Sequence, residues 1–98
     1  MENYQTINVE TLKNLLDSEN INLIDVREVF EYDENHIPQA INIPLSVLRE
    51  NTDKFKKDEH YHIICRSGNR SGQACQYLSV LGIETTNVDG GMLDWEAQ

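Results

Sequence analysis

The sequence predicts an α/β protein whose mainly parallel sheet carries helices on both faces. Short apolar runs, which suit buried strands, alternate along the chain with segments whose apolar residues recur at helical spacing. Breaks at Ile37-Pro38 and at Gly82 separate neighbouring segments. Because a helix between two strands provides the crossover that parallel pairing requires, this alternation predicts parallel strands.

The first helix and the first strand are expected between Asn8 and residue 26. Asn8 can cap a helix over residues 9 to about 18, where leucines recur at helical spacing. The apolar run at residues 23–26 ends at charged residues and predicts a buried strand. One or two helical turns are expected next, over residues 28–33.

The middle of the chain predicts two strands joined by a short helix and a polar connection. Residues 41–43 alternate briefly and stop at Pro44, which predicts a short strand. A short helix is expected over residues 46–51, and the lysine-rich stretch 52–59 predicts a solvated surface connection. Residues 61–64 form the next expected strand.

The last third predicts two helices around one strand. Ser71 is expected to cap a helix, and Gly82 suits the left-handed residue that ends it. The inward-facing stripe of this helix consists of Ala74, Leu78 and Leu81. A strand over residues 85–88, a Gly90-Gly91 turn and a short helix carrying Trp95 complete the chain.

The composition indicates one globular domain over residues 1–98. A chain of 98 residues, 39% hydrophobic and 26% charged, can bury one core but is too short for two. Its start has neither the basic region nor the apolar core of a secretory signal, and no apolar run is long enough to cross a bilayer. We therefore expect a soluble cytoplasmic protein.

The formal net charge of −9 argues against nucleic-acid and membrane partners. Polyanion binding needs Lys and Arg side chains that displace counterions, and here the acidic residues dominate. Two cysteines, Cys65 and Cys75, are too few for a disulfide framework, and their spacing is not that of zinc ligands. No metal or other cofactor is expected.

Cys65 follows the predicted strand 61–64 and begins the stretch Cys-Arg-Ser-Gly-Asn-Arg-Ser-Gly. Backbone N–H groups at the start of a helix lack intrahelical partners and favour negative charge, as do the side chains of Arg66 and Arg70. Gly68 permits positive φ inside the turn. We therefore expect Cys65 to be largely thiolate at neutral pH, which is the nucleophilic form of cysteine.

Cys75 is interpreted differently, as core packing beside the inward stripe of the same helix. A disulfide with Cys65 would require Cα atoms within about 7 Å of each other. A strand end and a position five residues into the helix do not favour that approach.

Three polar features fall at the carboxyl ends of predicted strands. They are residues 25–27, the Cys65 loop and residues 89–91. Ligands of parallel sheets gather beyond these ends, so a shared pocket is expected.

Together, the motifs of the chain resemble those of single-domain rhodaneses, a sulfurtransferase family, from about Ile7 to Trp95. The motifs are Leu23-Ile24-Asp25-Val26-Arg27-Glu28, Glu31-Tyr32, His36-Ile37-Pro38, Ala40-Ile41-Asn42-Ile43-Pro44, Cys65-Arg66-Ser67-Gly68-Asn69-Arg70-Ser71 and Asp89-Gly90-Gly91 before Trp95. Each is weak alone, whereas the combination is highly specific.

The resemblance implies a three-layer sandwich with a five-stranded sheet and Cys65 as the catalytic residue. The residues whose backbone amides would bind substrate are Arg66, Ser67, Gly68, Asn69, Arg70 and Ser71. The implied reaction has two steps. The Cys65 thiolate takes the outer sulfur of a small anionic donor such as thiosulfate, and the resulting persulfide passes it to cyanide, a thiol or a protein. Because sulfite leaves as a stable anion, no general acid is required.

Other polar residues are assigned supporting roles. Asp25 and Arg27 are expected to brace loops through hydrogen bonds and an ion pair, with Glu31 as a further partner. Arg66 is expected to attract anionic donors, while Arg70 either does the same or pairs with an acidic neighbour. His36 is interpreted as structural, since no step needs a base.

The chain departs from the family pattern at several positions around the expected pocket. Asn35 and Gln39 replace common glycines, Val29 replaces a frequent proline, and Met92 replaces a residue that is usually aromatic or branched. Phe30 stands where a charged residue is usual and is expected on the pocket rim. These changes leave the loop chemistry intact but alter the outline of the pocket.

Two alternative functions stay open. One is a sulfur-carrier or interaction module that a partner protein loads with persulfide. The other is a cysteine phosphatase or arsenate reductase, which is less favoured. Phosphatases of related architecture place one residue more between cysteine and arginine than the four that separate Cys65 from Arg70 here. A smaller ring of amides suits one added sulfur atom better than a phosphoryl group.

Overall fold

A computed structural model describes residues 4–98 and contains a five-stranded parallel sheet with helices on both faces. The strands are β1 (Gln5–Ile7), β2 (Asn22–Asp25), β3 (Ala40–Asn42), β4 (His60–Ile64) and β5 (Glu84–Val88). The helices are α1 (Val9–Ser18), α2 (Val29–Glu34), the 3-10 helix η1 (Leu45–Lys54), α3 (Asn69–Val80) and α4 (Gly91–Ala97). The strand order is β1-β5-β4-β2-β3, and each of these pairings is parallel. The predicted fold class is confirmed.

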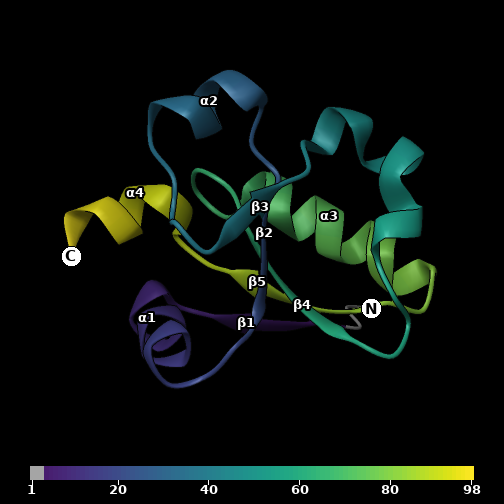
Figure 1. The fold of residues 1–98 in the computed structure, drawn as a ribbon, viewed down its shortest axis with the longest axis horizontal. Coiled ribbons are helices and arrows are strands. Elements are labelled where there is room, and N and C mark those ends of the chain that lie inside the picture. The colour runs from purple at the N-terminus through teal and green to yellow at the C-terminus, as the bar shows by residue number, and fades with distance from the viewer. Residues whose placement is uncertain (1–3) are drawn as a thin grey trace.

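Two hydrophobic clusters cover the two faces of the sheet, because successive side chains of a strand point to opposite sides. Leu23 and Ile64 face the cluster that α1 and α4 complete with Leu12 and Met92. Ile24 and Ile63 face the other cluster, formed with η1 and α3. Figure 1 shows α1 below α4 on the left of the view, with α3 to their right. Each fully buried Leu or Ile side chain stabilises the fold by about 1.5–3 kcal/mol.

The local capping signals near the N-terminus behave as predicted. Helix α1 spans Val9–Ser18, and the Asn8 side chain accepts a hydrogen bond of 2.9 Å from the N–H of Thr11. The sequence reading missed strand β1, whose three residues pair with residues 86–88 at the end of β5. Such a short segment, mostly exposed, has no alternating pattern of its own and becomes a strand only through pairing.

The expected surface connection over residues 52–59 is partly wrong. Helix η1 continues to Lys54, with a kink at Val47 and Asn51, rather than ending at Asn51. Phe55 is buried and packs its ring edge-on against Tyr61, with centroids 4.9 Å apart. The lysines on either side of Phe55 led to the prediction of a solvated segment, although Phe55 itself belongs to the core. Within residues 4–98, no helix combines the length and apolar character that crossing a bilayer demands.

Candidate active site

The carboxyl ends of β2, β4 and β5 bring the three predicted polar segments together. The N–H of Val26 donates to the carbonyl of Ile64 at 2.9 Å, which joins the segment after β2 to the end of β4. The N–H groups of Met92 and Leu93 donate to the carbonyls of Cys65 and Arg66, at 2.8 and 3.0 Å. In Figure 1 the loop between β4 and α3 lies between α2 and α4. The shared site expected from the sequence therefore has a structural basis.

Gly91 allows helix α4 to approach the Cys65 loop this closely. A Cβ atom at this position would lie 2.6 Å from the carbonyl carbon and oxygen of Arg66, and closer still to the carbonyl oxygen of Cys65. Its φ of +54° is also in the left-handed region that favours glycine. The absence of a side chain at residue 91 thus lets the α4 amides reach the two carbonyls.

The sulfur of Cys65 lies in a ring of hydrogen-bond donors. The residue is fully buried, and its Sγ accepts a hydrogen bond of 3.1 Å from the N–H of Gly68. The hydroxyl of Ser71 lies 3.2 Å from the same sulfur. Burial alone would raise the pKa of Cys65, but the Ser71 hydroxyl and the N–H groups of Ser71, Gly68 and Ser67 outweigh it, and the pKa is lowered. This environment favours the thiolate.

Ser71 faces the sulfur instead of capping the helix, so the predicted cap is wrong. Helix α3 begins at Asn69, three residues earlier than that cap implied, and Gly68 occupies the N-cap position with φ +107°. Ser71 is therefore inside the first turn, fully buried, with its hydroxyl turned toward Cys65. Serine was an ambiguous signal because its short polar side chain suits both a cap and a buried hydrogen bond.

The two loop arginines occupy different positions. Arg70 is bound by Glu31 of α2, with Nη1 2.6 Å and Nη2 2.9 Å from the two carboxylate oxygens. Arg66 is exposed and lies on the wall of the adjoining cleft. Of the two roles left open for Arg70, pairing with an acidic neighbour is the one that its contacts match.

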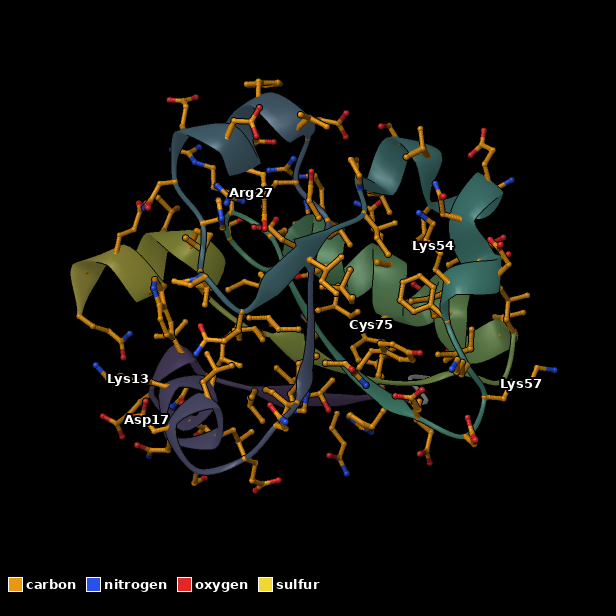
Figure 2. All side chains as sticks on the ribbon, viewed as in Figure 1. Lys13, Asp17, Arg27, Lys54, Lys57 and Cys75 are labelled. Atoms are coloured by element: carbon orange, nitrogen blue, oxygen red, sulfur yellow. The ribbon has the colours of Figure 1, made fainter. Side chains whose placement is uncertain are left out.

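Asp25 and Arg27 form a buried pair beneath helix α2. The Asp25 carboxylate accepts hydrogen bonds from the Arg27 guanidinium, the shortest of them 2.8 Å. The guanidinium also donates to the backbone carbonyls of Glu31 and Asn35, at 3.3 and 2.7 Å. Figure 2 shows Arg27 below α2. The expected ion pair is present, and the bracing role of these two residues stays a prediction. Glu31 contributes its backbone carbonyl, while its carboxylate binds Arg70.

A cleft of about 690 Å³ opens beside the Cys65 loop, between α2 and α4. Arg66 and Arg70 contribute to its wall, and Phe30 lines it with 67% of its surface exposed, as the sequence led us to expect. The prediction did not include the α4 residues Leu93 and Glu96. Their spacing puts both on one face of a helix, but only the packing of α4 on the loop directs that face toward the cleft.

His36 lies on the surface, and Cys75 lies in the core. His36 is exposed, stacks on Tyr32 at 3.7 Å between ring centroids, and contacts the Tyr32 carbonyl through Nδ1 at 2.7 Å. Cys75 lies in the interior (Figure 2), where burial raises the pKa of its thiol to about 11. Both cysteines are free thiols. Cys75 accordingly belongs to the hydrophobic core.

Comparison with known proteins gives the same family as the motifs. The rhodanese-like domain family matches residues 8–98. "Putative sulfurtransferase YtwF" of Bacillus subtilis is 43% identical over 93 residues, which cover 94% of this chain and 90% of that protein. The crystal structure of a rhodanese-like domain protein from Staphylococcus aureus superposes with a TM-score of 0.89 at 38% identity, over 93% of this chain and 90% of that one.

A further relative is longer than this chain. "Putative sulfur carrier protein YrkF" of Bacillus subtilis is 37% identical over 91% of this chain, and the match covers 49% of YrkF. The sequence, the parallel sheet and the loop around a buried cysteine all agree with these comparisons. The chain belongs to the rhodanese-like domain family.

Proposed function

We propose that this protein is a sulfurtransferase that carries a sulfane sulfur as a persulfide on Cys65. The observation that supports it most directly is the hydrogen bond of 3.1 Å from the Gly68 N–H to the Cys65 sulfur. Together with the Ser71 hydroxyl at 3.2 Å, it stabilises negative charge on the sulfur. The sulfurtransferase name of YtwF, 43% identical, supports the same reaction class.

In the proposed first step, the Cys65 thiolate attacks the outer sulfur of thiosulfate. A bond forms between Sγ and that sulfur, the sulfur–sulfur bond of thiosulfate breaks, and its electron pair leaves with sulfite. In the second step, a thiolate or cyanide attacks the outer sulfur of the persulfide, and the electron pair of the broken bond returns to Cys65. Each step exchanges one nucleophile for another, so neither an external oxidant nor a general acid is needed.

The contacts of the loop favour binding of the sulfur over general acid–base chemistry. We assign the loop amides, from Arg66 to Ser71, to the binding of the transferred sulfur and the donor, and Asp25 and Arg27 to loop support. Phosphate-ester cleavage would need an acid to protonate the leaving alkoxide. Two residues near the strand ends, Asp25 and Asp89, are the candidates for such an acid. Asp25 is fully buried and held by Arg27, and Asp89 is exposed outside the cleft. The phosphatase alternative therefore has less support.

The decisive test compares Cys65→Ser with the matched variant Cys75→Ser in the formation of thiocyanate from thiosulfate and cyanide. We expect Cys65→Ser to abolish the reaction and Cys75→Ser to retain it, since burial places the pKa of Cys75 at about 11 and keeps its thiol protonated. Undiminished activity in Cys65→Ser would end the proposal.

A second candidate is a sulfur carrier that receives persulfide from a protein and reacts poorly with thiosulfate. We keep this alternative because YrkF, which is 37% identical to this chain, is named as a putative sulfur carrier protein. Mass spectrometry of the intact protein separates the two. A thiosulfate sulfurtransferase gains one sulfur atom from thiosulfate alone, whereas a carrier gains it only from a persulfidated protein.

A further inference from the structure

The cleft beside Cys65 has more unpaired carboxylates than unpaired cations. Two of its three arginines, Arg27 and Arg70, are already bound to Asp25 and Glu31. Within residues 4–98 the third, Arg66, forms no ion pair. The cleft therefore offers a ligand a single available positive charge.

Three further glutamates line the same cleft and form no ion pair within the described part of the chain. They are Glu28, Glu34 and Glu96. Glu28 accepts a hydrogen bond of 2.8 Å from the Ser46 hydroxyl, and Glu96 accepts one from the Asn35 amide. Both donors are neutral, so neither hydrogen bond supplies a counter-charge. Four glutamates and three arginines line the cleft, so its negative charges outnumber its positive charges.

Apolar side chains stand among these carboxylates on the two walls. Phe30 of α2 is 67% exposed and Leu93 of α4 is 46% exposed, although both are large hydrophobic residues. A cleft of about 690 Å³ is in the size range of sites that enclose drug-sized ligands, far larger than one sulfur oxyanion needs. Its lining suits a ligand with an apolar part and positive charges.

These observations lead beyond the proposed function, on which this inference rests. We propose that the sulfur partner of Cys65 is a protein segment whose cysteine is flanked by Lys or Arg and by an apolar residue. The positive side chains would pair with Glu34 and Glu96, and the apolar residue would contact Phe30 and Leu93. The net charge of −9 on the whole chain would also steer such a segment toward the protein.

The transfer itself balances without another reactant. The partner thiol loses its proton to solvent, and its thiolate attacks the outer sulfur of the Cys65 persulfide. A bond forms between the partner sulfur and the outer sulfur, the bond from that sulfur to Sγ breaks, and the electron pair remains on Cys65 as thiolate. The reverse direction loads Cys65 from a persulfidated partner.

The rate test uses two acetylated, amidated tetrapeptides, Lys-Leu-Cys-Lys and Glu-Leu-Cys-Glu, as acceptors from persulfidated protein. Loss of the added sulfur from the protein is followed by mass spectrometry, and each rate is divided by that of the same peptide with a small disulfide, which corrects for thiol reactivity. We expect the basic peptide to react at least about tenfold faster at low ionic strength, with the ratio falling as salt is added. Equal corrected rates, or a faster acidic peptide, would overturn the proposal.

Two matched pairs of variants locate the effect. The double variant Glu34→Gln, Glu96→Gln should remove most of the preference for the basic peptide. The control double variant Glu10→Gln, Asp17→Asn changes the net charge by the same amount on α1 and should keep that preference. Leu93→Ser should weaken the reaction of both peptides, while Val80→Ser, which replaces an apolar residue 80% exposed on α3, should not. Equal effects within either pair would rule out the cleft as the docking site.

A binding test separates this inference from the sulfur chemistry. Fluorescein-labelled peptides with Ser in place of Cys are titrated with the protein, and anisotropy is measured. We expect Lys-Leu-Ser-Lys to bind more tightly than Glu-Leu-Ser-Glu, and we expect the Glu34→Gln, Glu96→Gln double variant to lose this difference. That result would support the docking surface even if Cys65 never accepts sulfur. Failure of Cys65 to gain sulfur would contradict only the proposed function, whereas equal binding of the two peptides would contradict this inference.

Discussion

The carboxylate of Glu31 holds the guanidinium of Arg70 through two hydrogen bonds, at 2.6 and 2.9 Å. The same carboxylate accepts a hydrogen bond of 3.0 Å from the N–H of Glu28, which closes the first turn of α2 as a capping box. One side chain therefore ties helix α2 to the first turn of α3, which follows the loop that holds the Cys65 sulfur. The position of α2, and of Phe30 on it, is coupled to that loop.

Replacing Glu31 by Gln should destabilise the protein by about 1–2 kcal/mol at neutral pH, allowing for screening at a partly exposed pair. The pair with Arg70 lowers the pKa of Glu31 from 4.5 to about 2, despite opposing desolvation. A carboxyl whose pKa is lowered by folding stabilises the native state above its unfolded value and loses that contribution as the pH falls.

The difference in free energy of unfolding between wild type and Glu31→Gln should therefore shrink as the pH falls from about 4.5 toward about 2. Urea denaturation at several pH values measures it. Glu34→Gln, an exposed change on the same helix, is the control and should have little effect. A difference that stays constant over this range would show that the ion pair is not the cause.

Ser71→Ala should raise the pKa of Cys65, because it removes the side-chain hydrogen bond that opposes the effect of burial. In a Cys75→Ala background, the thiolate absorbance in the ultraviolet reports Cys65 alone. This absorbance should develop at higher pH in the Ser71→Ala variant than in the protein that keeps Ser71. Sulfur loading at pH 7 should slow several-fold, since the thiolate is the nucleophile. Ser79→Ala, an equal change further along α3, is the control and should leave the titration of Cys65 unaltered. An unshifted curve in Ser71→Ala would refute the assignment of the Ser71 hydroxyl as a group that lowers the pKa of Cys65.

Asp25→Asn should cost about 3–5 kcal/mol, because it leaves the buried guanidinium of Arg27 without its counter-charge. Lys56→Gln breaks the exposed pair with Glu59, 3.9 Å apart, and should cost less than about 0.5 kcal/mol. Thermal unfolding compares the two. If Asp25→Asn kept its stability but lost sulfur transfer, Asp25 would have a direct chemical role instead of the bracing role assigned to it.

Gly91→Ala should destabilise the protein by about 3 kcal/mol or more, since the new Cβ would overlap the carbonyls of Cys65 and Arg66. Gly82→Ala is the matched control. Gly82 also has positive φ, +82°, but the nearest atom to a Cβ there is Lys57 Cε at 4.0 Å. That variant should lose only about 1 kcal/mol from backbone strain. Similar losses in urea denaturation would mean that close approach at residue 91 is unimportant.

The predicted elements that formed as expected have strong local signals. Helix α1 combines a cap at Asn8 with periodic leucines, and β2 and β4 are apolar runs that suit buried strands of a parallel sheet. Strand β1 and the buried Phe55 were missed because their short, polar surroundings contain no such signal. Ser71 was placed at the helix start but was misread as a cap, since its true partner is the Cys65 sulfur.

The sequence by itself determined the alternation of strands and helices, the strand-end location of Cys65 and the glycine-containing turn that exposes backbone amides to it. These depend on residues close together along the chain, where spacing and backbone preference decide the outcome. Only the tertiary structure decided that the Glu31 carboxylate binds Arg70 instead of Arg27, that the Asp25–Arg27 pair is buried beneath α2, and that α4 forms a wall of the cleft. The reason is physical: a charge finds its partner through distances and burial that exist only after packing, and several carboxylates compete for each arginine along the sequence.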